Sequence, residues 1–247
     1  MEVAERKEKS SMKIEWIELK ERDFSRLLYT NPVVFLSTCG QEGQKNVMVL
    51  SWLTATNNKG GFVFSINKRR HTVSLLSKER NFVLSVPTAE MEEIVLEVGK
   101  TSGQFGSKFK SSSDEDQHTD LTVGKTERAE VSDERKFPLS KRQKKKLRRL
   151  NPEVDGLKAV SLYSSDEMRS SSYLFAIEGT VAYLQCKLHS MEETKIDDEH
   201  YLVSAEVTRA SVNSSYWYPE KCIFRPQEGM PPYLTFFGSQ TFGYVTS

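Results

Sequence analysis

The sequence predicts a mainly β domain with few, short helices, whose antiparallel strands close on themselves or on a second copy of the chain. Strand-like runs in the N-terminal third are separated by short turns that contain Gly, which is typical of antiparallel hairpins. The run 46–54 is apolar on both alternating faces. A strand that is buried on both faces fits a closed barrel or a dimer interface better than an open sheet with one wet face.

The first elements follow one another closely along the chain. Apolar residues at helical spacing predict a short helix over 20–29, which Asn31-Pro32 should end. Strands and turns are then expected to alternate at 33–38 (strand), 40–43 (turn), 46–54 (strand), 57–61 (turn) and 62–66 (strand). Turns this short would join the three strands as an antiparallel meander.

Two helices and further strands are expected after this meander. Thr72 is a suitable N-cap for a helix that runs to Glu79, and 81–86 has the composition of a fourth strand. Apolar residues at helical spacing predict a second helix over 91–98. Later strand character is expected at 173–188, at 201–213 and, as the end of the fold, at 231–238.

A polar insertion is predicted in the middle of the chain. The segment 114–116 is acidic, and 141–149 consists almost entirely of Lys and Arg. Little between 110 and 155 could pack against a core, so this stretch is expected to be loosely ordered or disordered. The predicted domain organisation is a mobile tail at 1–20 and a single domain at 21–247, which the insertion at about 110–155 interrupts.

The basic run 141–149 has three interpretations. It could be a nuclear localisation signal, a contact to nucleic acid or the ribosome, or a solvated segment. No aromatic residue stands between its cations, so stacking on bases is unsupported. Targeting and solvation are therefore favoured over sequence-specific binding.

Bulk composition excludes several classes of protein. The net charge is +1, so the whole molecule does not bind polyanions through its bulk charge. Three cysteines, Cys39, Cys186 and Cys222, lack paired spacing, which argues against a disulfide framework and for a reducing compartment. The charged N-terminus lacks the apolar segment of a secretory signal, and no apolar run approaches the ~20 residues needed to span a bilayer. We expect a soluble, intracellular protein, cytoplasmic or nuclear, with no membrane contact.

Common catalytic and nucleotide-binding motifs are missing. Gly-Lys-Thr occurs at 99–101 and at 124–126, but a P-loop requires an earlier glycine where this chain has Ile94 and Thr119. The Rossmann glycine pattern and the Gly-x-Ser-x-Gly elbow do not occur. The histidines lack metal-ligand spacing, so no metal site is expected.

The most informative local feature is the basic turn at 68–72. Three cations follow a predicted strand and lead directly into a predicted helix. Cations beside a helix N-terminus form an anion site, because free backbone N–H groups, the helix dipole and a guanidinium converge there. The alternative is an ordinary solvated basic turn.

Four blocks, taken together and in order, resemble the flavin reductase-like, flavoredoxin-type family of FMN-binding proteins. They are Asn46–Trp52, Phe64–Ile66 with Lys68–Thr72, Asn81–Thr88, and Gly99–Gly103 with Lys108-Phe109. The resemblance is close from Asn31 to Phe109 and weak from about Tyr173 to Gly238, and it does not cover the insertion. Asn67 stands where the family usually has a glycine, a mild departure because Asn also tolerates positive φ.

The resemblance implies an antiparallel, Greek-key-like split β-barrel with short peripheral helices, which forms a homodimer and binds FMN near the subunit interface. The turn 68–72 would hold the phosphate, chiefly through Arg70 and Thr72, and the strand residues would line the flavin ring and ribityl chain. Taken alone, Leu50 and Trp52 would more often be core residues. The implied FMN contacts are Leu50, Ser51, Trp52, Thr54, Ser65, Lys68, Arg69, Arg70, Thr72, Pro87, Ser102, Gly103, Lys108 and Phe109.

Three functions remain open at this point. The first is an oxidoreductase, either an NAD(P)H-dependent flavin reductase or a flavin-mediated electron carrier, for which no catalytic side chain is assigned. The second is a non-catalytic FMN-binding module whose basic insertion docks on nucleic acid or a protein. The third is a barrel that binds no flavin.

Overall fold

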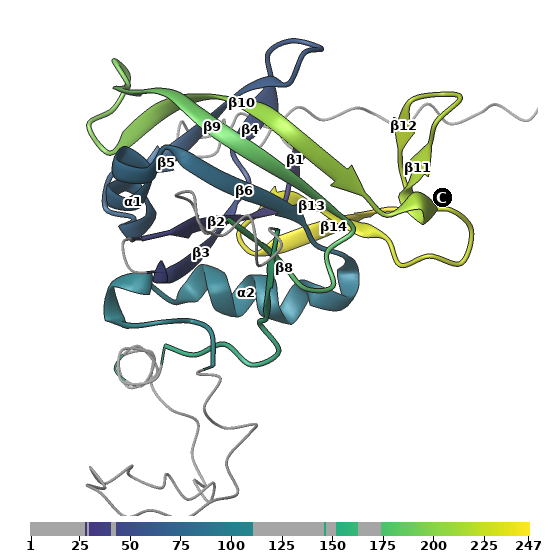
Figure 1. Cartoon of the computed structure of the whole chain (residues 1–247), viewed down its shortest axis with the longest axis horizontal. Helices are drawn as coiled ribbons and strands as arrows, with labels where there is room; N and C mark the ends of the chain where they lie inside the picture. The colour runs from purple at the N-terminus through teal and green to yellow at the C-terminus, as the bar shows by residue number, and fades with distance from the viewer. Residues whose placement is uncertain (1–27, 29, 41–42, 111–145, 147–151, 163–173) are drawn as a thin grey trace, which may run out of the picture.

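The central element is a seven-stranded antiparallel sheet in the order β3-β2-β6-β9-β10-β5-β4 (Figure 1). This computed structural model describes residues 28, 30–40, 43–110, 146, 152–162 and 174–247. The strands of the sheet are β2 (Val34–Cys39), β3 (Lys45–Leu50), β4 (Leu53–Ala55), β5 (Gly61–Asn67), β6 (Asn81–Val86), β9 (Ala182–Glu193) and β10 (His200–Val212).

A two-residue link determines how this sheet bends. β3 and β4 are its two edge strands, yet only Ser51 and Trp52 separate them along the chain. A flat sheet of this width would hold its edges roughly 29 Å apart, whereas such a link reaches about 11 Å at most. The sheet must therefore curl into a barrel that is split along one seam, between β3 and β4.

The interior of the barrel is filled by alternate residues of its strands. Phe62, Phe64 and Ile66 of β5 are buried, whereas the residues between them face outward and are half-exposed. The ring of Phe64 packs edge-on against Phe82 of β6, with the ring centres 5.9 Å apart. This cluster is the main core of the described structure.

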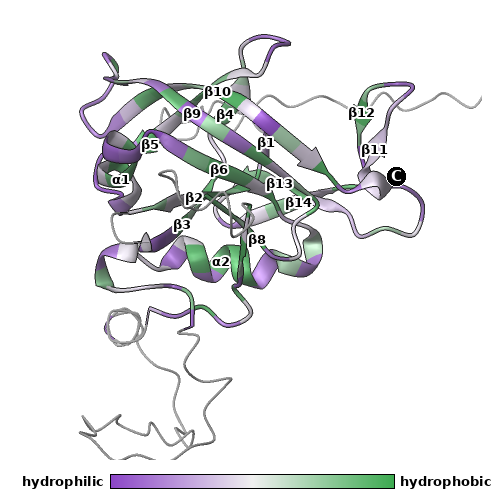
Figure 2. Cartoon of the chain, in the orientation of Figure 1, coloured by the Kyte–Doolittle hydropathy of each residue, from purple (hydrophilic) through white to green (hydrophobic). Residues whose placement is uncertain are grey.

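A second core lies outside the barrel wall, under the helix α2 (Glu92–Lys100). Figure 2 shows hydrophobic and hydrophilic stretches alternating along this helix, and its Val95 and Val98 are buried. Phe35 and Val47 of the barrel wall pack into this outer core, while their neighbours in sequence face the interior. The prediction of a strand buried on both faces is confirmed for β3.

Shorter elements surround the barrel. The helix α1 (His71–Glu79) covers one end, and a small sheet of order β1-β13-β14 lies beside the outer core. The remaining elements are β1 (Asn31–Pro32), η3 (Ala89–Met91), η4 (Gly103–Phe105), β7 (Ala159–Ser161), β8 (Phe175–Ile177), η7 (Ser214–Tyr216), β11 (Trp217–Tyr218), β12 (Ile223–Phe224), β13 (Tyr233–Gly238) and β14 (Thr241–Val245). In the described part of the chain, no helix combines the length and apolar character needed to cross a bilayer.

The expected strand at 46–54 is wrong as a single element. It divides into β3 and β4, which pair with different neighbours at opposite edges of the sheet. The predicted meander is therefore two separate hairpins, β2–β3 and β4–β5. The apolar sequence continues through the break, so the pattern alone does not show it.

The N-cap prediction at Thr72 is also wrong. α1 begins at His71 with Arg70 in the N-cap position, and no side chain caps it. The Thr72 side chain is buried and accepts a hydrogen bond from Asn46 Nδ2 at 3.0 Å, so it is engaged away from the helix end.

Three other boundaries differ from the expectation. The run 173–188 contains two strands, β8 and β9, and β14 follows the segment that was expected to end the fold. Val154 and Leu157 are buried in the outer core, so packing resumes before the expected end of the insertion at 155. The tail 1–20, the expected helix at 20–29 except Leu28, and the basic run except Lys146 lie outside the described residues.

Candidate functional site

A pocket opens where the start of α1, the edge strand β3 and the segment after α2 come together. It is lined by Asn46, Met48, Val49, Arg70, His71, Thr72, Val98, Gly99, Thr101, Ser102, Gly103 and Lys108. The lining includes two cationic side chains and a histidine but no carboxylate. The residues from the expected FMN set that meet here are Arg70, Thr72, Ser102, Gly103 and Lys108.

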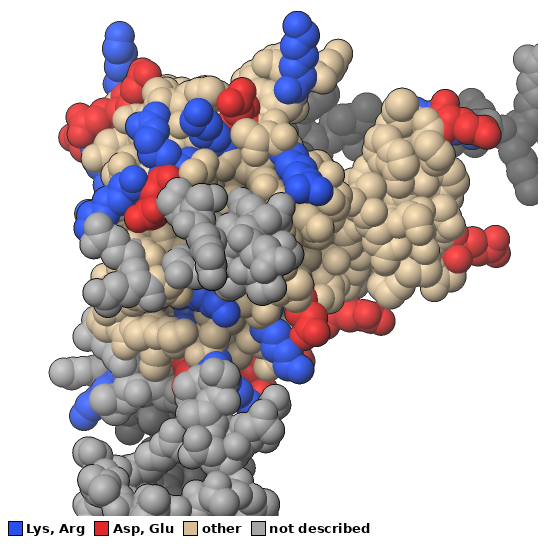
Figure 3. Space-filling model, viewed as in Figure 1, with Lys and Arg blue, Asp and Glu red and all other residues tan. Residues whose placement is uncertain are grey.

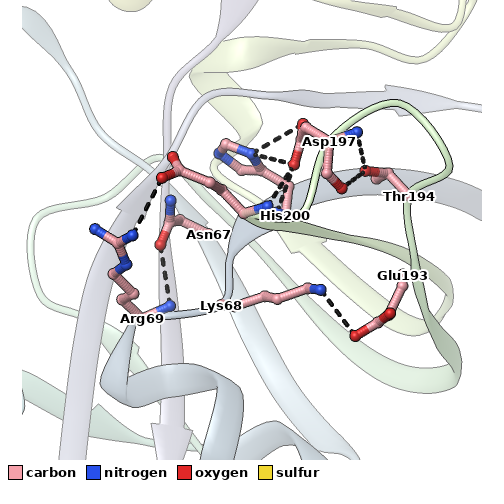
Figure 4. Close-up of polar contacts among 8 residues, drawn as sticks. Asn67, Lys68, Arg69, Glu193, Thr194, Asp197 and His200 are labelled. Atoms are coloured by element: carbon pink, nitrogen blue, oxygen red, sulfur yellow. Dashed lines mark hydrogen bonds and ion pairs between the residues drawn. The ribbon is translucent and has the colours of Figure 1, made fainter.

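The basic turn brings the end of β5 to the start of α1. Asn67 shapes the turn, because its backbone oxygen accepts from Arg70 N at 3.0 Å and its Oδ1 accepts from Arg69 N at 3.0 Å (Figure 4). The first N–H groups of a helix have no partners within the helix, and no side chain caps this one. The turn therefore places the positive end of the helix dipole beside the pocket.

Two of the three cations in the turn point elsewhere. Lys68 Nζ forms an ion pair with Glu193 at 2.8 Å, and Arg69 forms one with Glu199 at 3.2 Å (Figure 4). Both partners belong to the β9–β10 hairpin and its loop. Arg70 alone of these cations lines the pocket.

Lys108 is a cation buried without a carboxylate partner among the described residues. Its side chain is 3% exposed, and Nζ donates to Val47 O at 2.7 Å and to Val98 O at 3.2 Å. Burial, and secondarily the charge of Arg70, lower the pKa of Lys108 to about 7. The ammonium thus covers a carbonyl of the edge strand β3 and adds positive charge to the pocket when protonated.

His71 is a pocket residue that the sequence analysis did not select. Its Nε2 is buried and has no hydrogen-bond partner in the described part of the chain. Burial and then the charge of Lys108 lower the pKa of His71 below its ordinary value. Its place between Arg70 and Thr72 in the basic turn is the sequence signal that points to it.

Asn46 connects the pocket to the barrel and was also missed as a site residue. Its Nδ2 lies 3.0 Å from both Thr38 Oγ1 and Thr72 Oγ1, which ties β3 to the first turn of α1. Gly103 approaches this amide so closely that a Cβ there would collide with Asn46 Oδ1 and crowd His71. The absence of a side chain at 103 therefore keeps this wall of the pocket in place.

The expected ring-contacting residues lie along the seam, on the outer surface of the barrel. Ser65 N donates to Trp52 O at 2.9 Å, which joins β5 to the link between β3 and β4. Trp52 is 42% exposed, and Thr54 is exposed beside it. Ser65 lies on the outward-facing side of β5.

Leu50, Pro87 and Phe109 are buried in the structure and do not line the pocket. Leu50 lies in the barrel core, and the ring of Phe109 packs edge-on against Phe175 at 5.5 Å. Pro87 lies beside β13, where its carbonyl accepts from Leu234 N at 3.4 Å. The side chains of Leu50 and Phe109 are thus core residues, as the packing interpretation of Leu50 predicts.

His200 is a third residue that the sequence analysis missed. Its ring lies 5.5 Å from the ring of Trp52, and its Nδ1 is 3.2 Å from both carboxylate oxygens of Asp197 (Figure 4). Asp197 is held in turn by the backbone N–H of Glu199 at 2.7 Å. The imidazole is therefore oriented beside the seam by a carboxylate that is itself fixed.

The positive charge of the pocket is local. On the face shown in Figure 3, basic and acidic side chains are interspersed. Ion pairs between exposed side chains contribute little to stability. Because the two signs of charge are mixed, their electric fields largely cancel at a distance. The cationic lining of the pocket is therefore not an extension of a broad basic surface on that face.

The curled sheet, its seam and the adjacent pocket define a split-barrel protein, and the comparisons agree with that class. Residues 24–134 match the model of the flavin reductase like domain. No curated protein sequence matches the chain. The match over residues 24–134 confirms the resemblance seen in the sequence, and the solved structures confirm the split-barrel fold.

Solved structures with the same fold are distant in sequence. The FMN-binding protein from Thermus thermophilus is 16% identical, with a TM-score of 0.57, over 95% of this chain and 97% of that one. Flavoredoxin from Methanosarcina acetivorans is 16% identical, with a TM-score of 0.56, over 95% and 93%. An NADH:FAD oxidoreductase from Streptomyces globisporus is 15% identical, with a TM-score of 0.53, over 96% and 100%. Identities this low show the fold alone.

Proposed function

We propose that the protein binds FMN, with the phosphate in the pocket at Arg70, His71 and Lys108 and the flavin ring along the seam. The observation that carries this proposal is the cationic pocket without a lining carboxylate at the uncapped start of α1. A phosphate monoester matches such a set of donors, because it carries nearly two negative charges and several acceptor oxygens. The unpartnered Nε2 of His71 supports the same ligand chemistry.

The other residues of the expected set have supporting roles in this proposal. Ser102 and Gly103 line the pocket together with Arg70, and Thr72 stays tied to Asn46 so that the first turn of α1 keeps its position. The exposed Trp52 and Thr54 and the half-buried Ser51 and Ser65 offer surface along the seam for a planar ring. When bound, FMN supplies hydride and single-electron chemistry at its ring. The chain itself binds and orients the FMN and neutralises the charge of its phosphate.

The activity we propose is that of an oxidoreductase, either an NAD(P)H-dependent flavin reductase or a flavin-mediated electron carrier. The flavin reductase-like domain and the NADH:FAD oxidoreductase with the same fold support this class. Trp52 and the oriented His200 provide an aromatic surface where a second planar group could approach the seam. The alternative, a non-catalytic FMN-binding module that docks through its basic insertion, predicts flavin binding with negligible turnover.

Two assays on the purified chain test these proposals. An absorbance band near 450 nm (roughly, as for flavins in general) that persists through gel filtration would support flavin binding. NADH or NADPH oxidation that rises with added FMN would support the reductase. A protein that stays colourless and does not quench FMN fluorescence contradicts both, and bound flavin with no nicotinamide oxidation favours the non-catalytic module or an electron carrier with another donor.

We further propose that the chain forms a homodimer through the outer surface at the seam. Trp52 and Leu202 are 42% and 48% exposed there, and Leu202 is the cross-strand neighbour of Ser65, which bonds to Trp52. Exposed apolar side chains that lie together often mark an interface. Sedimentation should give the mass of two chains for the native protein and a single chain for Leu202→Glu.

Replacing Arg70 distinguishes the contribution of the phosphate to FMN binding from that of the rest of the flavin. We expect Arg70→Met to weaken FMN binding by about 10- to 100-fold, because one charge-assisted hydrogen bond to phosphate is worth roughly 1.5–3 kcal/mol. Riboflavin, which lacks the phosphate, should bind the variant and the native protein equally well. Titration of flavin fluorescence measures both constants. An equal loss for the two flavins would place Arg70 at the ring instead.

The matched control is Arg69→Met. Arg69 is the neighbouring cation in the same turn, but it is paired with Glu199 and does not line the pocket. Its replacement should change FMN affinity by less than about threefold, through the general field alone. A loss as large as that of Arg70→Met would show that the turn acts as a diffuse charge and not as a directed site.

A further inference from the structure

Lys108 and His71 line the same pocket, and each carries a buried nitrogen without an anionic partner among the described residues. Lys108 Nζ is bonded only to the neutral carbonyls of Val47 and Val98 among the described contacts. His71 Nε2 has no partner in the described structure. Buried charges in proteins are usually paired, and an unpaired one tends to lose its charge instead.

The surrounding elements do not supply the missing counter-charge. The charged groups on the elements packed around Lys108 are Arg70 and His71 at the start of α1, Lys45 of β3, Glu92, Glu93, Glu97 and Lys100 of α2, Lys110 on the following segment, and Glu153, Asp155 and Lys158 before β7. Glu97 and Lys100 form an ion pair at 2.9 Å, and Lys110 and Asp155 form one at 2.7 Å. The one charge with a resolved effect on Lys108 is Arg70, and it opposes protonation.

We propose that an anion and a proton enter this pocket together, the proton being taken up by Lys108 from the solvent. The neutral amine of Lys108 becomes an ammonium, and no bond of the anion is broken. The proposal rests on the proposed function in one respect, namely that the anion is the phosphate of FMN. It adds that, above about pH 7, the amine of Lys108 is mostly neutral until the ligand binds.

The direction of the effect follows from the local electrostatics. With the pocket empty, burial and the charge of Arg70 hold the pKa of Lys108 at about 7, so at pH 8 the amine is mostly neutral. A dianion at hydrogen-bonding distance favours the ammonium and moves its pKa back toward the ordinary value. The protonated form is therefore the one that binds. Affinity for FMN should be highest between about pH 6, the second pKa of its phosphate, and pH 7, and fall as pH rises above 7 by up to about tenfold per pH unit.

Isothermal titration calorimetry of the full chain with FMN at pH 8 measures this coupling directly. The same titration in two buffers of different ionisation enthalpy gives the number of protons taken up per FMN bound. The phosphate of FMN is already a dianion at this pH, since the second pKa of a phosphate monoester is about 6. Uptake therefore belongs to the protein, and we expect most of one proton, because the lowered pKa of Lys108, about 7, leaves its amine mostly neutral at pH 8.

Two variants test which residue takes up the proton. Lys108→Met keeps the length and apolar stem of the side chain, and should reduce uptake to near zero while weakening FMN binding at pH 6.5 by at least about tenfold. His71→Gln is the control, because its amide can donate from nearly the same place but cannot titrate. It should retain the uptake. Uptake that persists in Lys108→Met and disappears in His71→Gln would move the proton to the histidine and overturn the assignment.

The outcomes separate this proposal from the proposed function. If the native protein binds FMN tightly but takes up less than about 0.2 proton, the coupling is overturned and FMN binding still stands. This measurement uses the native protein, so it does not depend on whether a variant folds. Equal affinity for FMN and riboflavin overturns the placement of the phosphate. If no flavin binds, sodium sulfate is the probe, because it does not titrate near pH 8. Proton uptake with sulfate supports the coupled site, and its absence overturns it.

Discussion

Replacing Gly103 by valine is expected to abolish measurable FMN binding and to destabilise the protein. A Cβ at this position would collide with Asn46 Oδ1 and crowd the ring of His71. If Asn46 moves, its bonds to Thr38 and Thr72 are strained, and these bonds hold the first turn of α1 against β3. Overpacking of this kind costs about 1–3 kcal/mol of stability, and the pocket loses the space next to its donors.

Flavin fluorescence titration and thermal unfolding measure the two effects in the same samples. Gly99→Ala is the control for stability, because a Cβ at Gly99 meets no atom within 4 Å. Gly99 lies in α2, where alanine is the better helix former, so stability should rise by up to about 1 kcal/mol. Gly103→Val with native FMN affinity would mean that the ligand does not use this part of the pocket.

Phe64→Ala is expected to cause the largest loss of stability. Phe64 is 1% exposed, and its ring packs against those of Phe62 and Phe82 in the middle of the barrel. Truncation of a buried phenylalanine to alanine costs about 3–5 kcal/mol, because the lost apolar burial is added to the cost of the cavity. Flavin binding should weaken at temperatures where part of the chain is unfolded and should be near native where it is folded.

Urea unfolding followed by circular dichroism gives the change in unfolding free energy. Ile196→Ala serves as the control, since Ile196 is 96% exposed and its loss should change stability by less than about 0.5 kcal/mol. An effect of Phe64→Ala below about 1 kcal/mol would contradict the assignment of this cluster as the main core.

The alternation of residues along the sequence predicted most strands of the barrel, because buried and outward-facing side chains alternate along a strand. The strand at 81–86 has the same bounds as β6, and the expected double-sided burial of β3 is found. The break at Ser51-Trp52 was missed because neither residue is a strand breaker. It arises from the closure of the sheet, since β3 and β4 belong to opposite edges.

The candidate site was less predictable because its geometry depends on distant residues. Lys68 and Arg69 were expected at the phosphate, but their partners Glu193 and Glu199 lie 125 and 130 residues away along the chain. Thr72 has the residue type of an N-cap, yet Asn46 engages its hydroxyl from 26 residues away. No local pattern encodes such contacts. Arg70, Ser102, Gly103 and Lys108 line the pocket as the resemblance implied, whereas His71 and Asn46 emerged only in three dimensions.

The order of strands has a consequence for how the protein folds during synthesis. The N-terminal half yields two separate sub-sheets, one of β3, β2 and β6 and one of β4 and β5, and the β9–β10 hairpin joins them by pairing with β6 on one side and β5 on the other. All residues that line the pocket precede this hairpin in the chain. A nascent chain can therefore contain every residue that lines the pocket and still lack the barrel that arranges them. Contacts so distant in sequence form slowly, so flavin should stabilise only chains released after the hairpin has been made.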